Sequence, residues 1–260
     1  MSLFKAVRIF ILLVVLAIVA GNHFLGAARL ATWDRTVWIT VYPIPADNKP
    51  ETRRYIANLR ASSFDEIGTF FTREASRYGL SIPDAAHFQL APIPFTQPPA
   101  LPQTDNPLAI GWWSLRMRWW AWRQEHQDGL LDPDIQVFIR YRSVEGMPRL
   151  QRSVGLQKGR YTLVNAYASP RMASRNRFVV AHELLHVFGA TDKYDYATGH
   201  PIPPDGLADP NARPLFPQRR AEIMGGYIAV SPRESRMPAS LAGAVVGPMT
   251  AGEIGWLAQP

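Results

Sequence analysis

The stretch from Val179 to Asp195, VVAHELLHVFGATDKYD, constrains the fold more than any other part of the chain. Two histidines, His182 and His186, lie four residues apart, and Glu183 directly follows the first of them. On an α-helix, residues at this spacing project from the same face, one turn apart. We therefore expect a helix over residues 174–188 that presents two imidazoles to a single point.

Two imidazoles that meet at one point suit a tetrahedral zinc ion, and the neighbouring glutamate would lie near the open coordination position. A carboxylate there can take a proton from zinc-bound water and pass it to a leaving amine. Leu184, Leu185, Val187 and Phe188 surround the motif with apolar side chains, and unpaired charge is costly to bury among them. The pattern predicts a Zn²⁺ cofactor bound by His182 and His186, with Glu183 as the catalytic base.

A third protein ligand has to come from outside the helix. Gly189 can adopt the left-handed conformation that turns a chain back after a helix. Such a turn brings Asp192, six residues after His186, towards the same ion. Two other carboxylates remain alternatives: Asp195, and Glu222, which lies 36 residues after His186. If it is not a ligand, Glu222 could orient a ligand histidine as an outer partner.

The resulting pattern, H-E-x-x-H-x-x-G-x-x-D over residues 182–192, resembles the H-E-x-x-H-x-x-G-x-x-H motif of the metzincin metallopeptidases. Aspartate replaces the last histidine, as in the snapalysin-like bacterial members of that family. Downstream, AEIMGGY places Met224 in a glycine-rich turn similar to the metzincin Met-turn, which packs beneath the metal. Tyr227 follows, and some metzincins place a tyrosine near the zinc after that turn. The similarity spans residues 178–227.

The resemblance implies an α+β fold with a metzincin-like catalytic domain. A twisted mixed sheet and the active-site helix would form its upper part, above an irregular lower subdomain. It also implies the metal ligands His182, His186 and Asp192, and a zinc-dependent endopeptidase that acts on a peptide or protein substrate. The alternatives are a zinc-stabilised membrane-associated binding or assembly protein without hydrolytic activity, and a zinc hydrolase of non-peptide amides. An intact Glu183 favours hydrolysis, because a purely structural site gains nothing from a base.

Elsewhere, hydrophobic periodicity and turn residues predict the remaining elements. Ser63 is the expected N-cap of a helix over residues 63–79, with Glu66 closing a capping box. The strand Tyr161–Ala166 is the expected sheet edge, which would hold an extended substrate by strand addition. Lys193, Tyr194 and Tyr196 flank the metal site, where an oxyanion would need stabilising, although a structural role is the simpler interpretation. Further strands are expected at 36–44, 87–93 and 135–142, and helices at 108–127 and 250–257.

The N-terminus predicts membrane attachment. Lys5 and Arg8 precede twelve uninterrupted apolar residues, Ile9–Ala20. We expect a signal anchor or transmembrane helix over residues 1–29, followed by the catalytic domain over residues 30–260. Positive charge before the apolar run favours a catalytic domain outside the cytoplasm, on the periplasmic or extracellular side. A signal peptide cleaved near Ala28 is the alternative.

The helix over residues 108–127 contains GWWSLRMRWWAWR, which places tryptophans and arginines on one broad face. Such a face can lie in a membrane interface or pack inside the fold. The net charge is +7, and the surplus lies in the middle of the chain, with twelve Lys and Arg against five Asp and Glu between Arg116 and Arg177. We expect membrane lipid as a partner of the N-terminal helix and of this helix, and no nucleic acid, since no nucleic-acid motif accompanies the charge. The chain has no cysteine, which excludes disulfides and thiol chemistry.

Overall fold

The computed structural model describes residues 32–102, 104, 106–126, 129–145, 150, 153–156 and 160–257. The predicted anchor at residues 1–29 lies outside this set. Within the described ranges, no helix combines the length and the hydrophobicity that crossing a bilayer requires.

A five-stranded sheet with the order β2-β1-β3-β5-β4 forms the centre of the protein. β1, β2, β3 and β5 are parallel, and β4 runs antiparallel to β5. β5 pairs on both sides, so the prediction that residues 161–166 form the sheet edge is wrong: β4 is the edge. The strands are β1 (Val37–Pro45), β2 (Ala86–Leu90), β3 (Ile135–Arg142), β4 (Val154–Leu156) and β5 (Tyr161–Tyr167).

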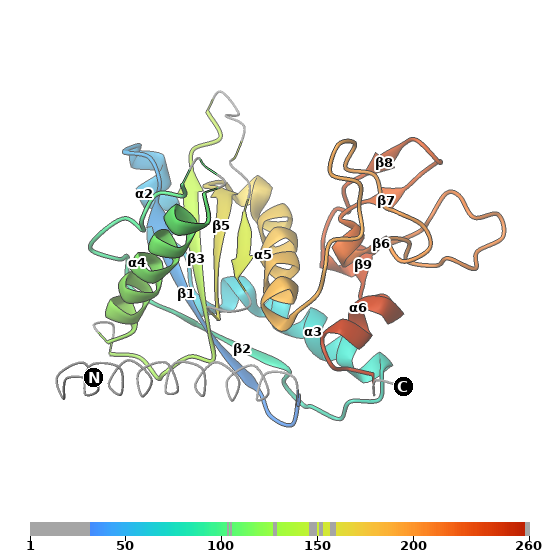
Figure 1. Ribbon diagram of the computed structural model, residues 1–260, viewed down its shortest axis with the longest axis horizontal. Coiled ribbons are helices and arrows are strands. Elements are labelled where there is room, and N and C mark those ends of the chain that lie inside the picture. Colours follow the sequence, from blue (N-terminus) through green and yellow to red (C-terminus); the bar gives the residue numbers. More distant parts are fainter. Residues whose placement is uncertain are drawn as a thin grey trace, which may run out of the picture.

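Helices cover both faces of the sheet, which gives a mixed α/β architecture with a largely parallel sheet. α4 (Pro107–Glu125) lies on one face and α5 (Ala173–Phe188) on the other (Figure 1). Successive side chains of a strand point to opposite faces. In β1, Ile39 and Val41 therefore join the core beneath α5, whereas Tyr42 and Ile44 join the core beneath α4. The α5 side also carries α2 (Pro50–Ala57) and α3 (Asp65–Arg77).

The chain enters α3 differently from the sequence prediction. A 3₁₀ turn, η1 (Ala61–Phe64), precedes the helix. Within it, the Ser63 hydroxyl accepts a hydrogen bond from the backbone N–H of Arg60 at 3.0 Å. Glu66 does not close a capping box with Ser63. Its carboxylate instead pairs with the Arg177 guanidinium of α5 at 2.5 Å and so ties the two helices together.

The tryptophans of α4 do not share one face. Trp113 and Trp120 are buried against the sheet, and their indole N–H groups donate to the Pro99 carbonyl and the Thr96 hydroxyl. Trp112 and Trp119 are exposed. The broad tryptophan–arginine face predicted from the sequence therefore divides into a packing side and a solvent side.

Beyond α5, the described residues 190–257 form only short elements, as the many prolines and glycines predict (Figure 1, orange to red). The residues of this C-terminal third that face the sheet, including Met224, Val246 and Trp256, join the same core as α5. The elements are β6 (Ala221–Glu222), η4 (Ile223–Gly225), β7 (Ile228–Ala229), β8 (Ser235–Arg236), η5 (Leu241–Gly243), β9 (Ala244–Val245) and α6 (Pro248–Glu253).

Candidate metal centre

α5 carries both histidines and ends where the sequence predicts. Gly189 has a φ of 112°, a left-handed conformation that costs little for glycine and strains other residues. Backbone hydrogen bonds from Gly189 to His186 and from Ala190 to Leu185 close the last turn at 3.1 and 2.9 Å. The chain then reverses direction and runs back alongside the helix.

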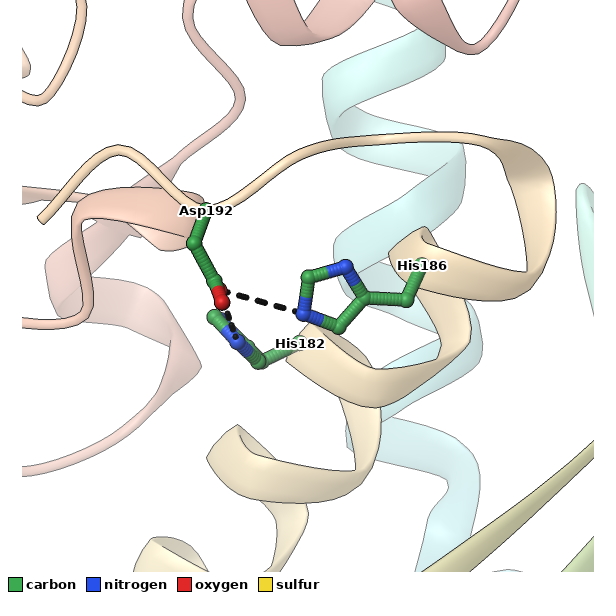
Figure 2. A group of neighbouring side chains, drawn as sticks. All are labelled: His182, His186 and Asp192. Atoms are coloured by element: carbon green, nitrogen blue, oxygen red, sulfur yellow. Dashed lines mark ion pairs between the residues drawn. The ribbon is translucent and has the colours of Figure 1, made fainter. Parts of the chain in front are cut away.

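This reversal brings Asp192 to the two histidines (Figure 2). Its Oδ1 atom lies 3.1 Å from Nε2 of His182 and 3.1 Å from Nε2 of His186. The three atoms lie within 4.8 Å of one another, so the group could hold a metal ion. Ligand atoms around a tetrahedral zinc ion are about 3.3 Å apart, given bonds of roughly 2.0–2.1 Å. The two distances from Oδ1 are therefore close to those between ligand atoms of one zinc ion.

The hydrogen bonds of the imidazoles favour a cation at this point. Nδ1 of His182 lies 3.0 Å from the Ile223 carbonyl, and Nδ1 of His186 lies 2.8 Å from the Ala190 carbonyl. A carbonyl only accepts, so each Nδ1 carries a hydrogen and each neutral Nε2 presents a lone pair. Two lone pairs and a carboxylate oxygen repel one another unless positive charge lies among them, either as protons or as one metal ion.

The pKa shifts have the same cause. Burial opposes ionisation of Asp192, but where protons supply the positive charge, hydrogen bonds donated by Nε2–H of the two histidines outweigh it and hold the pKa of this carboxyl well below its usual range. Burial likewise opposes the charged form of His182. The carboxylates of Asp192 and Glu183 and the Ile223 carbonyl outweigh burial and raise the pKa of His182. The group of side chains thus has a negative potential that attracts a cation.

Glu183 lies beside the metal group without belonging to it. The residue is 7% exposed, and its charge contributes to the raised pKa of His182. The three-residue group itself contains His182, His186 and Asp192. Glu183 therefore acts on the group through its charge, and its role as a base stays a prediction.

The two alternative third ligands have other partners. Asp195 is exposed and accepts hydrogen bonds from the backbone of Ala197 and Thr198 and from the Thr198 hydroxyl. Glu222 is fully buried, and its carboxylate accepts from the N–H groups of Gly225 and Gly247 and from the Thr250 hydroxyl at 2.8 to 3.0 Å. Burial raises the pKa of Glu222, against the effect of these hydrogen bonds.

Glu222 therefore acts on the site through the turn that it begins. Its carboxylate holds η4, whose Ile223 carbonyl accepts from His182, and whose Met224 carbonyl accepts from the N–H of Lys193 at 2.9 Å. Met224 is fully buried, and the Ile223 carbonyl of the same turn accepts from His182; a Met-turn beneath a metal stays a prediction. Glu222 thus reaches His182 through the backbone of Ile223 and not through its own carboxylate, which binds Gly225, Gly247 and Thr250.

Three backbone segments meet behind the site with no room for side chains. A Cβ atom on Gly225 would lie 2.4 Å from the Gly206 carbonyl oxygen, and one on Gly206 would lie 2.2 Å from the Lys193 carbonyl oxygen. Both distances are shorter than any real Cβ contact. Glycine at these two positions lets the η4 turn and the segment after Asp192 approach each other.

A second set of contacts fixes Asp192 from the C-terminal side. The Glu253 carboxylate of α6 accepts from the N–H of Thr191 at 3.0 Å, from its hydroxyl at 2.6 Å and from the Lys193 ammonium at 2.7 Å. We call these contacts the Glu253 clasp. Since Lys193 is 6% exposed and its ammonium also donates to the Thr191 carbonyl at 3.0 Å, its role is structural. The partners lie sixty residues apart, so no local sequence pattern predicts the clasp.

Two of the flanking tyrosines contact the group. The Tyr196 hydroxyl donates to Oδ2 of Asp192 at 3.0 Å, which leaves Oδ1 directed at the histidines. The Tyr194 ring lies beside His182, with ring centroids 6.3 Å apart. Tyr227, expected near the metal, follows the η4 turn with 36% of its surface exposed.

Comparisons with known proteins yield no match, either to a protein-family model or, at a significant level, to a curated protein. Function is therefore inferred from the chemistry of the metal group and from the elements that surround it.

Proposed function

We propose that this protein is a zinc-dependent endopeptidase with a metzincin-like catalytic domain. One observation carries the proposal: a single carboxylate oxygen lies 3.1 Å from both Nε2 atoms of a His-Glu-x-x-His helix. Because the glutamate of that motif stays outside the ligand group, the part of the chain that the structure describes offers three ligands and a separate base. Structural zinc sites are closed by four protein ligands, whereas catalytic sites use three and keep one position open.

The donor set favours zinc over other common ions. Two imidazole nitrogens and one carboxylate oxygen are typical zinc ligands, whereas calcium and magnesium prefer oxygen donors alone. When bound by His182, His186 and Asp192, zinc would supply a Lewis acid that polarises a carbonyl and lowers the pKa of a water molecule. The negative charge of Asp192 would leave that water less acidic than three neutral ligands would.

Glu183 supplies the proton transfers of the proposed reaction. Its carboxylate takes a proton from the attacking water while a bond forms between the water oxygen and the scissile carbonyl carbon. The same group then delivers the proton to the amine nitrogen as the C–N bond breaks. Its burial beside His182 supports this role, because a buried base keeps its proton transfers away from bulk water.

The sheet edge next to α5 is suited to an extended peptide. β4 is the edge strand, it runs antiparallel to β5, and it packs against α5. A peptide bound as a further strand would use main-chain hydrogen bonds for affinity. We propose that β4 forms one wall of the substrate cleft and the C-terminal third the other. We further propose that residues 1–29 anchor the domain outside the cytoplasm.

The Glu183→Gln variant tests the proposal. The substitution keeps the size of the side chain and removes the base, so hydrolysis of a peptide library should fall by about 100-fold or more. Elemental analysis of the full chain in detergent should still find about one zinc ion per chain. Glu234→Gln, at an exposed position remote in sequence from the site, is the matched control.

Full activity in Glu183→Gln would contradict the proposed role of Glu183. A wild-type protein that binds zinc but cleaves no peptide would instead indicate a binding or assembly protein, or a hydrolase of another amide.

A further inference from the structure

The outer side of α4 carries an exposed apolar row. It consists of Leu108, Trp112, Leu115, Trp119 and Trp122, which we call the α4 stripe; they are 83%, 64%, 62%, 59% and 53% exposed. Their spacing of four, three, four and three residues places them on one line along the helix. The side of α4 that packs on the sheet, with Trp113, Met117 and Trp120, points the opposite way. The stripe is therefore not needed for packing of the described core.

Arginines border the stripe on both sides. On the helical wheel, Arg116 and Arg123 lie on one flank and Arg118 lies on the other. The Arg123 guanidinium sits 5.0 Å from the centre of the Trp119 ring, in a cation–π contact. The acidic side chain of α4 is Glu125, at its last position. A tryptophan-rich row with basic flanks is typical of helices that lie in the headgroup region of a bilayer.

The point where the N-terminal segment joins the domain lies at the same end of the sheet as the end of α4. Arg35, two residues before β1, pairs with Asp134 at 2.6 Å, and Asp134 lies nine residues after the end of α4. All four parallel strands begin at this end. The apolar run Ile9–Ala20 precedes this junction in the sequence. A bilayer that holds this run would thus lie within reach of the α4 stripe.

We propose that the α4 stripe binds the surface of an anionic bilayer, with its tryptophans among the headgroups and its arginines on lipid phosphates. A symmetric pair of chains joined through the stripe would bring arginine flanks together, whereas anionic headgroups neutralise them. α4 and α5 lie on opposite faces of the sheet (Figure 1). Docking through α4 therefore fixes the domain with the metal group on the side of the sheet away from the lipid.

The absence of cysteine from the chain permits a direct test. Leu115→Cys introduces one thiol in the middle of the stripe, and Arg233→Cys introduces one at an exposed position of the C-terminal third. Each full-length variant carries an environment-sensitive fluorophore and is reconstituted into vesicles of phosphatidylcholine and phosphatidylserine. We expect the label at position 115 to shift to the blue and to be quenched by nitroxide-labelled lipids. The label at position 233 should do neither.

The arginines give the second measurement. Arg116→Gln in the Leu115→Cys background should lower the ratio of lipid-contacting to solvent-exposed label about fivefold in anionic vesicles. It should have little effect in phosphatidylcholine alone. Because the fluorophore reports position and not hydrolysis, the result is independent of the proposed peptidase activity.

Three outcomes would overturn the proposal. A solvent-exposed label at position 115 would show that the stripe does not meet lipid. A label that is shielded but not quenched, and that becomes exposed when fewer chains occupy each vesicle, would identify a second copy as the partner. Shielding without quenching at any chain density would mean that the N-terminal segment covers the stripe.

Discussion

Different interactions stabilise two regions of the protein: the sheet region, residues 32–188, and the C-terminal third, residues 190–257. In the sheet region, long strands bury apolar side chains on both faces, such as Ile39, Val137 and Val164, each of them 0% exposed. In the C-terminal third, strands of two residues contribute little, and buried polar side chains that bind backbone groups supplement the apolar residues that join the α5 core. Gln218 is an example: it is 4% exposed and hydrogen-bonds to Asp209 and to the Leu215 carbonyl.

The metal group lies at the junction of these two regions. α5 fixes His182 and His186, whereas Asp192 depends on the η4 turn and the Glu253 clasp. The loss of one methyl group from an apolar core lowers the free energy of unfolding only modestly. A buried backbone group that loses its partner costs about 1–3 kcal/mol and disturbs its surroundings directly. Metal affinity should therefore respond strongly to the polar contacts of the C-terminal third and weakly to the sheet core.

The largest effect on metal affinity should come from Asp192 itself. Asp192→Asn keeps an oxygen but removes the charge that faces both imidazoles, so zinc affinity should fall by more than the roughly 10- to 100-fold expected for an outer partner. Asp192→His should recover part of the binding, because imidazole is also a zinc ligand. Competition with a fluorescent chelator measures both variants. Parental affinity in Asp192→Asn would remove this residue from the ligand set.

Glu222→Gln should have the next largest effect. The new amide N–H₂ would face at least one of the donors that Glu222 now accepts from, at Gly225, Gly247 or Thr250. We expect the free energy of unfolding to fall by about 1–3 kcal/mol and zinc affinity by about 10- to 100-fold. Chemical denaturation and chelator competition test the two parts, with Glu234→Gln as the exposed control. If zinc affinity falls as far as in Asp192→Asn while the fold stays stable, Glu222 is a ligand.

Glu253→Gln should weaken the Glu253 clasp and remove its contribution to the pH dependence of folding stability. Burial would raise the pKa of Glu253, but hydrogen bonds from Lys193 and Thr191 outweigh it and lower the pKa below its ordinary value of 4.5. A lowered carboxyl pKa stabilises the folded state above the ordinary value, and this contribution is lost as the pH falls below it. Thermal unfolding of the metal-free wild type should therefore lose stability more steeply below about pH 5 than the variant does. Identical pH profiles would show that the clasp contributes nothing to stability.

The smallest effect on metal affinity should come from the sheet core. Ile139→Val removes one buried methyl group from β3 and should cost about 0.5–1.5 kcal/mol of unfolding free energy. Zinc affinity should match that of the parent, because β3 contributes no residue to the metal group. A fall in zinc affinity as large as that of Glu222→Gln would show that the two regions do not differ as described.

The sequence predicted the elements whose residues carry a local pattern. The alternating residues of β1, β3 and β5, the periodic helix α5, the turn at Gly189 and the convergence of Asp192 with the two histidines all follow from spacing along the chain. The edge strand β4 could not be predicted in this way, because its three residues are too few to show a periodic pattern. α2 was missed because it buries only Thr52 and Ile56 and has no apolar stripe.

Contacts between residues that lie far apart in the sequence could not be predicted from it either. Glu222 and Glu253 are ordinary glutamates in the sequence, and their roles arise only when α6 packs next to the η4 turn. The division of the α4 tryptophans has a similar cause. Periodicity places Trp113 and Trp120 on a helix, but the position of the sheet decides which side of the helix is buried.

The Glu253 clasp has a consequence for the order in which the protein matures. A ribosome that has released Phe188 has already supplied every strand of the five-stranded sheet and both histidines of the metal group. The residue that holds both neighbours of Asp192 emerges sixty-five positions later. A nascent chain can therefore build its scaffold early and yet present an incomplete cation site until α6 is made. Metal capture would then mark the end of folding, which delays any chemistry until the whole domain has formed.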